Sequence, residues 1–170
     1  AKTIGPATSN PDIGPLISIR QKARFETLLE AAHTLPCIAK TPMPTDLPPG
    51  GAYVQPRLYG PVPPDHELAQ DELFGPVQVL IPFDTEEDAI QIANGTLYGL
   101  VAGVWTANGA RQMRLAKALK SGQVFINNYG AGGGVELPFG GIGKSGHGRE
   151  KGFEALYGFS TLKTVAAKHG

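Results

Sequence analysis

The chain has 170 residues, a length that suits one domain with a sizeable core. Its 15 basic and 15 acidic side chains give a formal net charge of zero, which argues against electrostatic binding to nucleic acid or to an anionic membrane. No apolar run approaches the roughly 18 residues of a membrane span, the N-terminus lacks a signal-peptide pattern, and the single cysteine cannot form an internal disulfide. These features predict a cytoplasmic protein that binds neither nucleic acid nor a membrane.

The first predicted element is an amphipathic helix over residues 18–32. Ser18 is a suitable N-cap, because its side chain can accept a hydrogen bond from the first helical turn. Apolar residues then recur at the spacing of one helix face, namely Phe25, Leu28, Leu29 and Ala32. Residues 36–64 contain nine of the 15 prolines and therefore cannot form regular helix. An extended connection is expected there, with at most a short strand near residues 52–58.

From residue 77 onwards, buried strands and helices are predicted to alternate. Apolar stretches at 77–83, 100–105 and 123–127 are typical of strands, and helical patterns at 85–94 and 108–120 separate them. Both helices begin with capping residues: Thr85 with Asp88, and Asn108. Strands that stay apolar without alternation are typical of parallel sheets covered on both faces. We therefore predict an α/β fold built on a β-α-β-α-β parallel sheet with flanking helices, followed by a glycine-rich loop and a C-terminal strand.

The glycine-rich loop matches two phosphate-binding signatures. Residues 141–146, GIGKSG, fit the G-x-G-x-x-G fingerprint, but loop sequence precedes them instead of a strand, and no acidic residue follows about twenty positions later. A P-loop would need glycine where Pro138 stands. The glycines are therefore predicted to permit close backbone approach and to hold Phe139 at a fixed place. Phe139 as a core aromatic, and Arg149 with Glu150 as a solvated pair, are the alternatives.

The remaining predictions from the residues concern the cysteine, the histidines and the C-terminus. Cys37 lies between a proline and an aliphatic residue, which favours a small buried hydrophobe. The four histidines do not share metal-ligand spacing, so no metal is assigned. Residues 159–168, FSTLKTVAAK, are predicted to form the final, more exposed strand.

Four long motifs follow one another along the chain: DELFGPVQVL (71–80), AIQIANGTLYGLVAGVWT (89–106), SGQVFINN (121–128) and LPFGGIGKSGHGREKG (137–152). In this order they resemble the C-terminal third of the NAD(P)-dependent aldehyde dehydrogenase superfamily. Residues 13–32 and 51–70 are similar to the segment that precedes these motifs in the family. The resemblance covers residues 13–165 and is far more specific than a three-glycine pattern.

The resemblance implies roles for individual residues of this chain. The glutamate of the family's E-x-F-G-P motif binds the hydroxyls of the nicotinamide ribose and corresponds to Glu72, while the phenylalanine near the nicotinamide ring corresponds to Phe74. The aromatic residue of P-F-G-G, at the substrate tunnel, corresponds to Phe139. The glutamate of G-R-E, which serves a proton or water path, corresponds to Glu150, and its neighbour Arg149 is expected to be structural, at a subunit contact.

The resemblance also implies what kind of protein this is. In the family the nucleophilic cysteine, the general-base glutamate, the oxyanion asparagine and the cofactor half lie upstream of this segment, so Cys37 does not stand in for the nucleophile. Residues 1–170 would be the C-terminal part of a catalytic domain, with 158–168 as a strand used in homo-oligomerisation. The complete enzyme would oxidise an aldehyde to a carboxylic acid with NAD or NADP, and the isolated chain would be inactive.

The substrate class is left open by the sequence, because the loop 129–137 is glycine-rich where many relatives place bulkier tunnel residues. The alternative to the enzyme interpretation is a noncatalytic structural or interaction module that joins other chains through its C-terminal strand.

Overall fold

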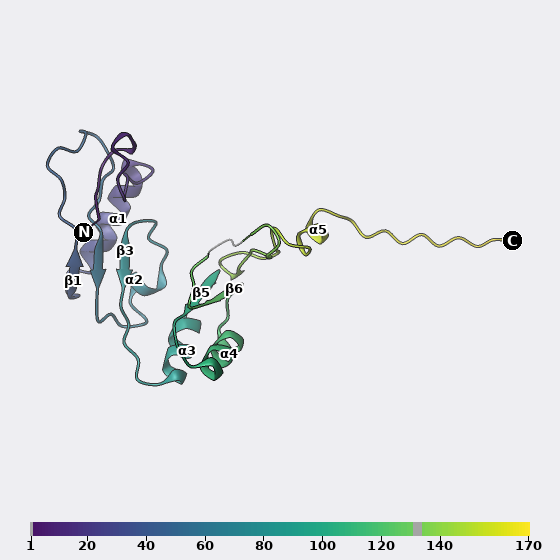
Figure 1. Ribbon diagram of the computed structural model, residues 1–170. Helices are drawn as coiled ribbons and strands as arrows, with labels where there is room; N and C mark the ends of the chain where they lie inside the picture. Colours follow the sequence, from purple (N-terminus) through teal and green to yellow (C-terminus); the bar gives the residue numbers. More distant parts are fainter. Residues whose placement is uncertain (1, 131–133) are drawn as a thin grey trace. The chain divides into compact units, whose positions relative to one another are not determined.

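The computed structural model describes residues 2–130 and 134–170, and the chain forms two compact units (Figure 1). The first unit is Ala1–Phe83 and the second is Asp84–Gly170. Each unit combines helices with hydrogen-bonded strands, so the α/β class predicted from the sequence is confirmed.

The main helix of the first unit, α1 (Ile19–Ala31), begins and packs as predicted. The Ser18 hydroxyl accepts a hydrogen bond from the backbone amide of Gln21 at 3.1 Å, which satisfies one of the free amides of the first turn. Phe25 and Leu29 on its apolar face are buried. A short 3₁₀ helix, η1 (Ala7–Ser9), precedes α1.

The sheet of the first unit has the strand order β1-β2-β3. β1 (Cys37–Lys40) is antiparallel to β2 (Arg57–Tyr59), and β2 is parallel to β3 (Val77–Val79). The proline-rich residues 36–64 are thus extended, as expected, but they contribute two strands where at most one was predicted. The short helix α2 (Glu67–Gln70) lies in the connection between β2 and β3.

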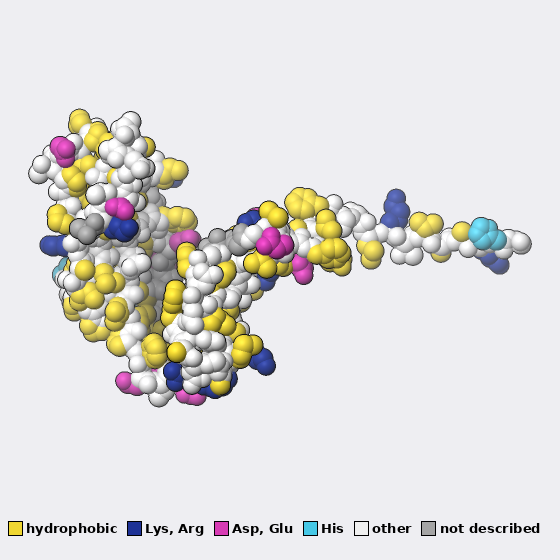
Figure 2. Space-filling model, in the orientation of Figure 1, with side chains coloured by type: hydrophobic (Ala, Val, Ile, Leu, Met, Phe, Trp, Pro, Cys, Tyr) yellow, Lys and Arg dark blue, Asp and Glu magenta, His cyan; other side chains and the backbone are white. Residues whose placement is uncertain are grey.

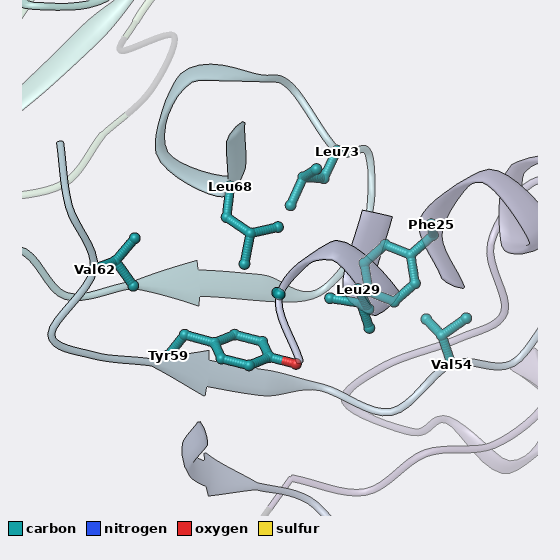
Figure 3. Packing of buried hydrophobic residues seen from close by; sticks show 8 residues of the cluster. Phe25, Leu29, Val54, Tyr59, Val62, Leu68 and Leu73 are labelled. Atoms are coloured by element: carbon teal, nitrogen blue, oxygen red, sulfur yellow. The ribbon is translucent and has the colours of Figure 1, made fainter. Parts of the chain in front are cut away.

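One hydrophobic cluster holds the first unit together (Figure 3). It consists of buried side chains from α1, β2, α2 and the connecting segments: Phe25, Leu29, Ala32, Val54, Tyr59, Val62, Leu68 and Leu73. Phe25 is fully buried, and burial of one such side chain contributes roughly 1.5–3 kcal/mol. The cluster therefore fixes α1 against the sheet and against the segment that leads into β3.

The second unit contains the predicted parallel β-α-β arrangement. β5 (Val101–Val104) and β6 (Gln123–Ile126) pair in parallel, and α4 (Gly109–Ala118) joins them. α3 (Glu86–Asn94) begins at the predicted capping box of Thr85 and Asp88. The remaining elements are β4 (Tyr98–Gly99), β7 (Ile142–Gly143), which pairs antiparallel with β4, and α5 (Ala155–Gly158).

The strand pairing differs from the sequence prediction at one point. The β-α-β-α-β pattern predicted that β3, β5 and β6 would share one parallel sheet, but β3 is hydrogen-bonded to β2, and β5 and β6 form a sheet of two strands. β3 has found its parallel neighbour in the proline-rich segment, where the strand β2 is only three residues long and leaves a weak signal in the sequence. The parallel pairing of β5 with β6 is as predicted, whereas the predicted pairing of β3 in the same sheet is wrong.

The C-terminal segment carries no strand within this chain. Residues 160–170 of the described structure are exposed and have no regular secondary structure. Figure 2 shows apolar side chains along this tail. Phe159, Leu162 and Val165 are at least four-fifths exposed. A strand requires a hydrogen-bonding neighbour, so the use of 158–168 as an oligomerisation strand stays a prediction.

Glu86 links the first turn of α3 to α4, which lies beside it (Figure 1). Its carboxylate accepts hydrogen bonds from Arg111 Nε at 3.0 Å and from Arg114 Nε and Nη2, both at 2.7 Å. These bonds, that from Arg114 above all, lower the pKa of Glu86 to about 2. Because the folded pKa lies below the ordinary value of 4.5, the ion pairs of Glu86 stabilise the fold fully above that pH. This stabilisation is lost as the pH falls towards 2 and the carboxylate becomes protonated.

We therefore expect Glu86→Gln to lower the melting temperature of the second unit at neutral pH and to have a smaller effect in acid. High salt should also reduce the difference, because the ion pairs are partly exposed. Circular-dichroism melts at about pH 7, 4 and 2.5 would measure this. Glu87→Gln, on the exposed side of the same helical turn, is the matched control. A difference between wild type and Glu86→Gln that does not change with pH would contradict the linkage.

Candidate functional site

The turn that contains Glu72 and Phe74 is built on α1. The Gln21 side chain donates a hydrogen bond from Nε2 to the Leu73 carbonyl at 2.8 Å. One turn later on α1, the buried Phe25 ring lies directly against Gly75, so closely that a Cβ at position 75 would collide with the ring. Glycine is required here for the close approach of helix and turn. Two contacts from one helix therefore fix this loop from both sides of Phe74.

Glu72 and Phe74 project from this turn towards solvent. Leu73, between them, is buried in the hydrophobic cluster, whereas Glu72 is exposed and Phe74 is 63% exposed. Phe74 has a φ of 49°, in the left-handed region that non-glycine residues rarely adopt. A large exposed aromatic ring held in an unfavourable backbone conformation indicates a surface prepared for a ligand or for another part of a protein.

The second unit brings Phe139 and Glu150 together through their backbones. The Phe139 amide donates to the Glu150 carbonyl at 2.7 Å, and the Glu150 amide donates to the Phe139 carbonyl at 2.6 Å. This antiparallel bridge closes the end of the glycine-rich loop. Phe139 is half-buried and Glu150 is exposed, so the first is not a fully buried core aromatic and the second has a carboxylate in contact with water.

The glycines of this loop serve close packing, as predicted. A Cβ at Gly143 would collide with the Leu97 carbonyl oxygen, and a Cβ at Gly122, outside the loop, would collide with the carbonyl oxygen of Gly140 within it. Gly143 also has a φ of 60°, which favours glycine. In the GIGKSG segment, the Lys144 amide donates to the Leu97 carbonyl at 2.8 Å. The Ser145 hydroxyl accepts a hydrogen bond from the Gly99 amide at 3.1 Å. These P-loop-like groups are therefore engaged in attaching the loop to β4.

Arg149 does not form the solvated pair with Glu150 that was one alternative. Its Nη1 donates to the Gly141 carbonyl at 3.1 Å and to the Gly148 carbonyl at 2.6 Å. Arg149 therefore ties the two ends of the loop together, which agrees with the structural role implied for it. Sequence spacing does not predict these two acceptors, because both are backbone groups.

Cys37 is exposed, so the prediction that it is a small buried hydrophobe is wrong. It lies on β1, an edge strand whose four residues are all exposed. The apolar neighbours in the sequence indicated burial, but an edge strand with an uncovered face does not provide it. Among the described residues, no group of three histidine, cysteine, aspartate or glutamate side chains could hold a metal ion.

Lys151 is a site residue that the sequence prediction missed. Its ammonium group lies 5.6 Å from the centre of the Phe139 ring, within the range of a cation–π interaction. The two residues are twelve positions apart, and only the backbone bridge of Phe139 with Glu150 brings them together.

No helix in the described part of the chain is long and apolar enough to span a membrane.

Comparisons with known proteins agree on one family. The model of the aldehyde dehydrogenase family matches residues 1–165. Betaine aldehyde dehydrogenase of Agrobacterium fabrum is 39% identical over 160 residues, which make up 93% of this chain and 32% of that protein. The NADP/NAD-dependent aldehyde dehydrogenase PuuC of Escherichia coli is 45% identical over 114 residues, 67% of this chain and 23% of that protein.

Solved structures give the same result. A crystal structure of a Burkholderia cenocepacia protein described as an aldehyde dehydrogenase shares 57% identity and a TM-score of 0.94, covering 100% of this chain and 36% of the other. Mycobacterium tuberculosis aldehyde dehydrogenase complexed with NAD+ shares 36% identity and a TM-score of 0.89, covering 100% of this chain and 35% of that chain. The chain thus spans about a third of the length of the relatives it matches.

Proposed function

Because the chain belongs to the aldehyde dehydrogenase family and spans about a third of its relatives' length, we propose that it is the C-terminal part of an enzyme that oxidises an aldehyde to a carboxylic acid with NAD+ or NADP+. The observation that carries this proposal is the turn at residues 72–76, where α1 fixes an exposed carboxylate and an exposed aromatic ring. The exposed thiol of Cys37 suits the reducing cytoplasm, where we place the enzyme.

The residues of this turn fit a nicotinamide nucleotide. An ionised carboxylate has two oxygens and can accept hydrogen bonds from both vicinal hydroxyls of a ribose, which suits Glu72. The exposed face of Phe74 can pack against a flat ring, and its position is fixed because Leu73 and Gly75 are held by α1. A nucleotide held here would supply the hydride acceptor of the oxidation. The part played by this chain is to place the ribose and the ring.

The second pair, Phe139 and Glu150, is assigned to the aldehyde side of the reaction. Phe139, fixed by its bridge to Glu150, supplies an apolar wall for the substrate. The exposed carboxylate of Glu150 can accept hydrogen bonds from water molecules, which a water or proton path requires. Neither residue forms a covalent intermediate, so both assist a nucleophile supplied by the upstream part of the enzyme.

We expect the isolated 170-residue chain to produce no NADH from aldehydes. Its one thiol, Cys37, lies on β1, and its Sγ lies 3.5 Å from the Ala39 carbonyl oxygen, with no base beside it among the described residues. A thiol needs such a partner to act as a nucleophile at neutral pH. Turnover should be measured by NADH absorbance with several aldehydes and with either nucleotide. Turnover that Cys37→Ala abolishes would make Cys37 the nucleophile and contradict the assignment of this segment.

A fusion provides the positive test. The upstream two-thirds of the Burkholderia cenocepacia protein can be joined to this chain, which is 57% identical to the segment that it replaces. The fusion should oxidise aldehydes, whereas the upstream portion alone should not. A folded fusion that binds nucleotide but oxidises no aldehyde would favour the alternative of a noncatalytic module.

In the same fusion, Glu72→Gln should weaken cofactor placement. The amide cannot make the charge-assisted hydrogen bonds, which contribute about 1.5–3 kcal/mol each, so the KM for the nucleotide should rise or kcat should fall by roughly tenfold or more. The KM for the aldehyde should change less. Glu67→Gln in the nearby helix α2 is a control that keeps the same change of charge. Unchanged kcat and unchanged nucleotide KM would remove Glu72 from the site.

We also propose that the complete enzyme is a homo-oligomer and that residues 158–168 pair with a strand of another subunit. The exposed apolar side chains of this tail support the proposal, since they need a cover in a water-soluble protein. Deletion of residues 159–170 from the fusion should lower its mass in light scattering, and an unchanged oligomeric state would contradict the proposal.

A further inference from the structure

Lys151 occupies one side of the Phe139 ring. Its ammonium nitrogen lies 5.6 Å from the ring centre, Phe139 is half-buried and Lys151 is exposed. The face of an aromatic ring carries partial negative charge and attracts cations. Here the protein's own cation already holds that position, so the wall formed by Phe139 differs electrically from a bare phenylalanine.

The backbone conformation of residue 151 favours glycine, so we infer that the lysine side chain found there has a role of its own. Lys151 has a φ of 61°, in the left-handed region where glycine is favoured. Hydrogen bonds of both neighbours hold the backbone there: the Glu150 amide donates to the Phe139 carbonyl at 2.6 Å, and the Gly152 amide donates to the Val135 carbonyl at 2.8 Å. Residues held in such conformations are found most often at functional sites. A glycine would fit this backbone without strain, so what lysine adds is a charged side chain over Phe139.

Two basic side chains lie next to Glu150 in the sequence. The guanidinium of Arg149 is bound to the backbone carbonyls of Gly141 and Gly148, and the ammonium group of Lys151 lies over the Phe139 ring. A cationic ligand that reaches this face of the Phe139 ring therefore meets the ammonium group of Lys151. Like charges about 10 Å apart at an interface of intermediate polarity change an affinity by about tenfold.

We propose that Lys151 is a positioning residue that makes the Phe139 wall select aldehydes with uncharged or anionic tails over aldehydes that carry a quaternary ammonium group. This inference rests on the proposed function, because it takes Phe139 as a wall of the aldehyde site. Lys151 acts in two ways: it restrains the Phe139 ring, and it takes the ring face on which a quaternary ammonium group would otherwise bind.

The contact can be tested in the 170-residue chain without catalysis. With 4-fluorophenylalanine at position 139, the fluorine NMR resonance should move in Lys151→Met and stay near its wild-type position in Lys151→Arg. Tetramethylammonium should then shift the resonance in Lys151→Met but not in the wild type. Lys163→Met, in the exposed tail, is the control for a general loss of charge. Lys151→Gly removes the charge without backbone strain and serves if Lys151→Met does not fold. Equal responses to tetramethylammonium with and without Lys151 would overturn the proposal.

Selectivity is tested in the active fusion with two aldehydes of the same shape, trimethylammonioacetaldehyde and 3,3-dimethylbutanal, which differ in the charge of one central atom. Lys151→Met should raise the ratio of their kcat/KM values in favour of the cation by about tenfold, and Lys151→Arg should not. If Lys151 had a merely structural role, Lys151→Met would lower the kcat/KM values of both aldehydes by the same factor. An unchanged ratio in an active enzyme would overturn the role of Lys151 alone. A fusion that oxidises no aldehyde at all would overturn the proposed function, whereas the NMR result on the contact of Lys151 with Phe139 would still stand.

Discussion

Phe25→Ala is expected to destabilise the first unit by about 3–5 kcal/mol, the cost of removing a fully buried aromatic side chain from a packed core. Phe25 is the largest fully buried side chain of the cluster and contacts the turn at Gly75 as well as its neighbours in the cluster. Little of the cavity can be refilled, because Gly75 has no side chain and Leu73 is already buried in the cluster.

The same substitution should release the turn that carries Glu72 and Phe74. The Gln21–Leu73 hydrogen bond would remain as the main restraint, and it holds one carbonyl of the turn. We therefore expect loss of stability and loss of cofactor placement to occur together in this variant. Glu72→Gln, in contrast, should affect cofactor placement alone.

Hydrogen exchange followed by mass spectrometry would separate the two units. In Phe25→Ala, peptides from residues 16–35 and 53–80 should exchange faster, and peptides from residues 98–127 should keep their wild-type rates. Arg24→Ala, at the exposed neighbouring position of α1, is the matched control and should change little. Equal acceleration across the whole chain would show that the two units unfold as one.

The features that could be predicted from the sequence are those decided by a few neighbouring residues. Ser18, the Thr85–Asp88 pair and Asn108 each cap a helix at the predicted position, because a cap needs only a side-chain oxygen and an amide two or three residues away. The parallel pairing of β5 and β6 was also predictable, since a helix-length connection between two apolar strands favours it.

The features that could not be predicted depend on distant partners. The choice of β2 as the neighbour of β3 is made by the packing of α1 on both strands, which a pattern within residues 77–127 does not contain. The exposure of Cys37 follows from the edge position of β1, which is also a property of the whole sheet. The tail 159–168 has the composition of a strand but no neighbour in this chain, so local propensity alone does not fold it.

The candidate site shows the same division. Glu72, Phe74, Phe139 and Glu150 were named through long motifs that resemble a family, and the residues that hold them were not. Gln21 and Phe25 support the first pair from a helix about fifty residues earlier, and Lys151 reaches Phe139 only because of the backbone bridge. These supporting contacts join backbone groups or ring faces, which leave no spacing rule in the sequence.

The second large effect is expected for Gly122→Ala. Gly122 precedes β6, and its amide donates to the Gly99 carbonyl at 3.0 Å, which fixes its position beside β4. A Cβ there would collide with the carbonyl oxygen of Gly140 and would lie 3.2 Å from the Cα of Gly141. Both obstacles are main-chain atoms, so no side-chain rotation relieves the collision, and the glycine-rich loop has to move away from β6. We expect a loss of about 3 kcal/mol, the upper end of the usual cost of overpacking.

Gly109→Ala is the matched control, because the same methyl group is added in the same unit with the opposite expected sign. Gly109 is the first residue of α4, and a Cβ there would have no neighbour within 4 Å. Alanine should stabilise this position by about 0.4–1 kcal/mol, since it restricts the unfolded chain. Urea unfolding followed by circular dichroism would measure both variants, and the fluorine resonance at position 139 would report movement of the loop. If Gly122→Ala were as stable as the wild type with an unchanged resonance, the close contact of β6 with the loop would not exist, and the bridge that joins Phe139 to Glu150 would need another support.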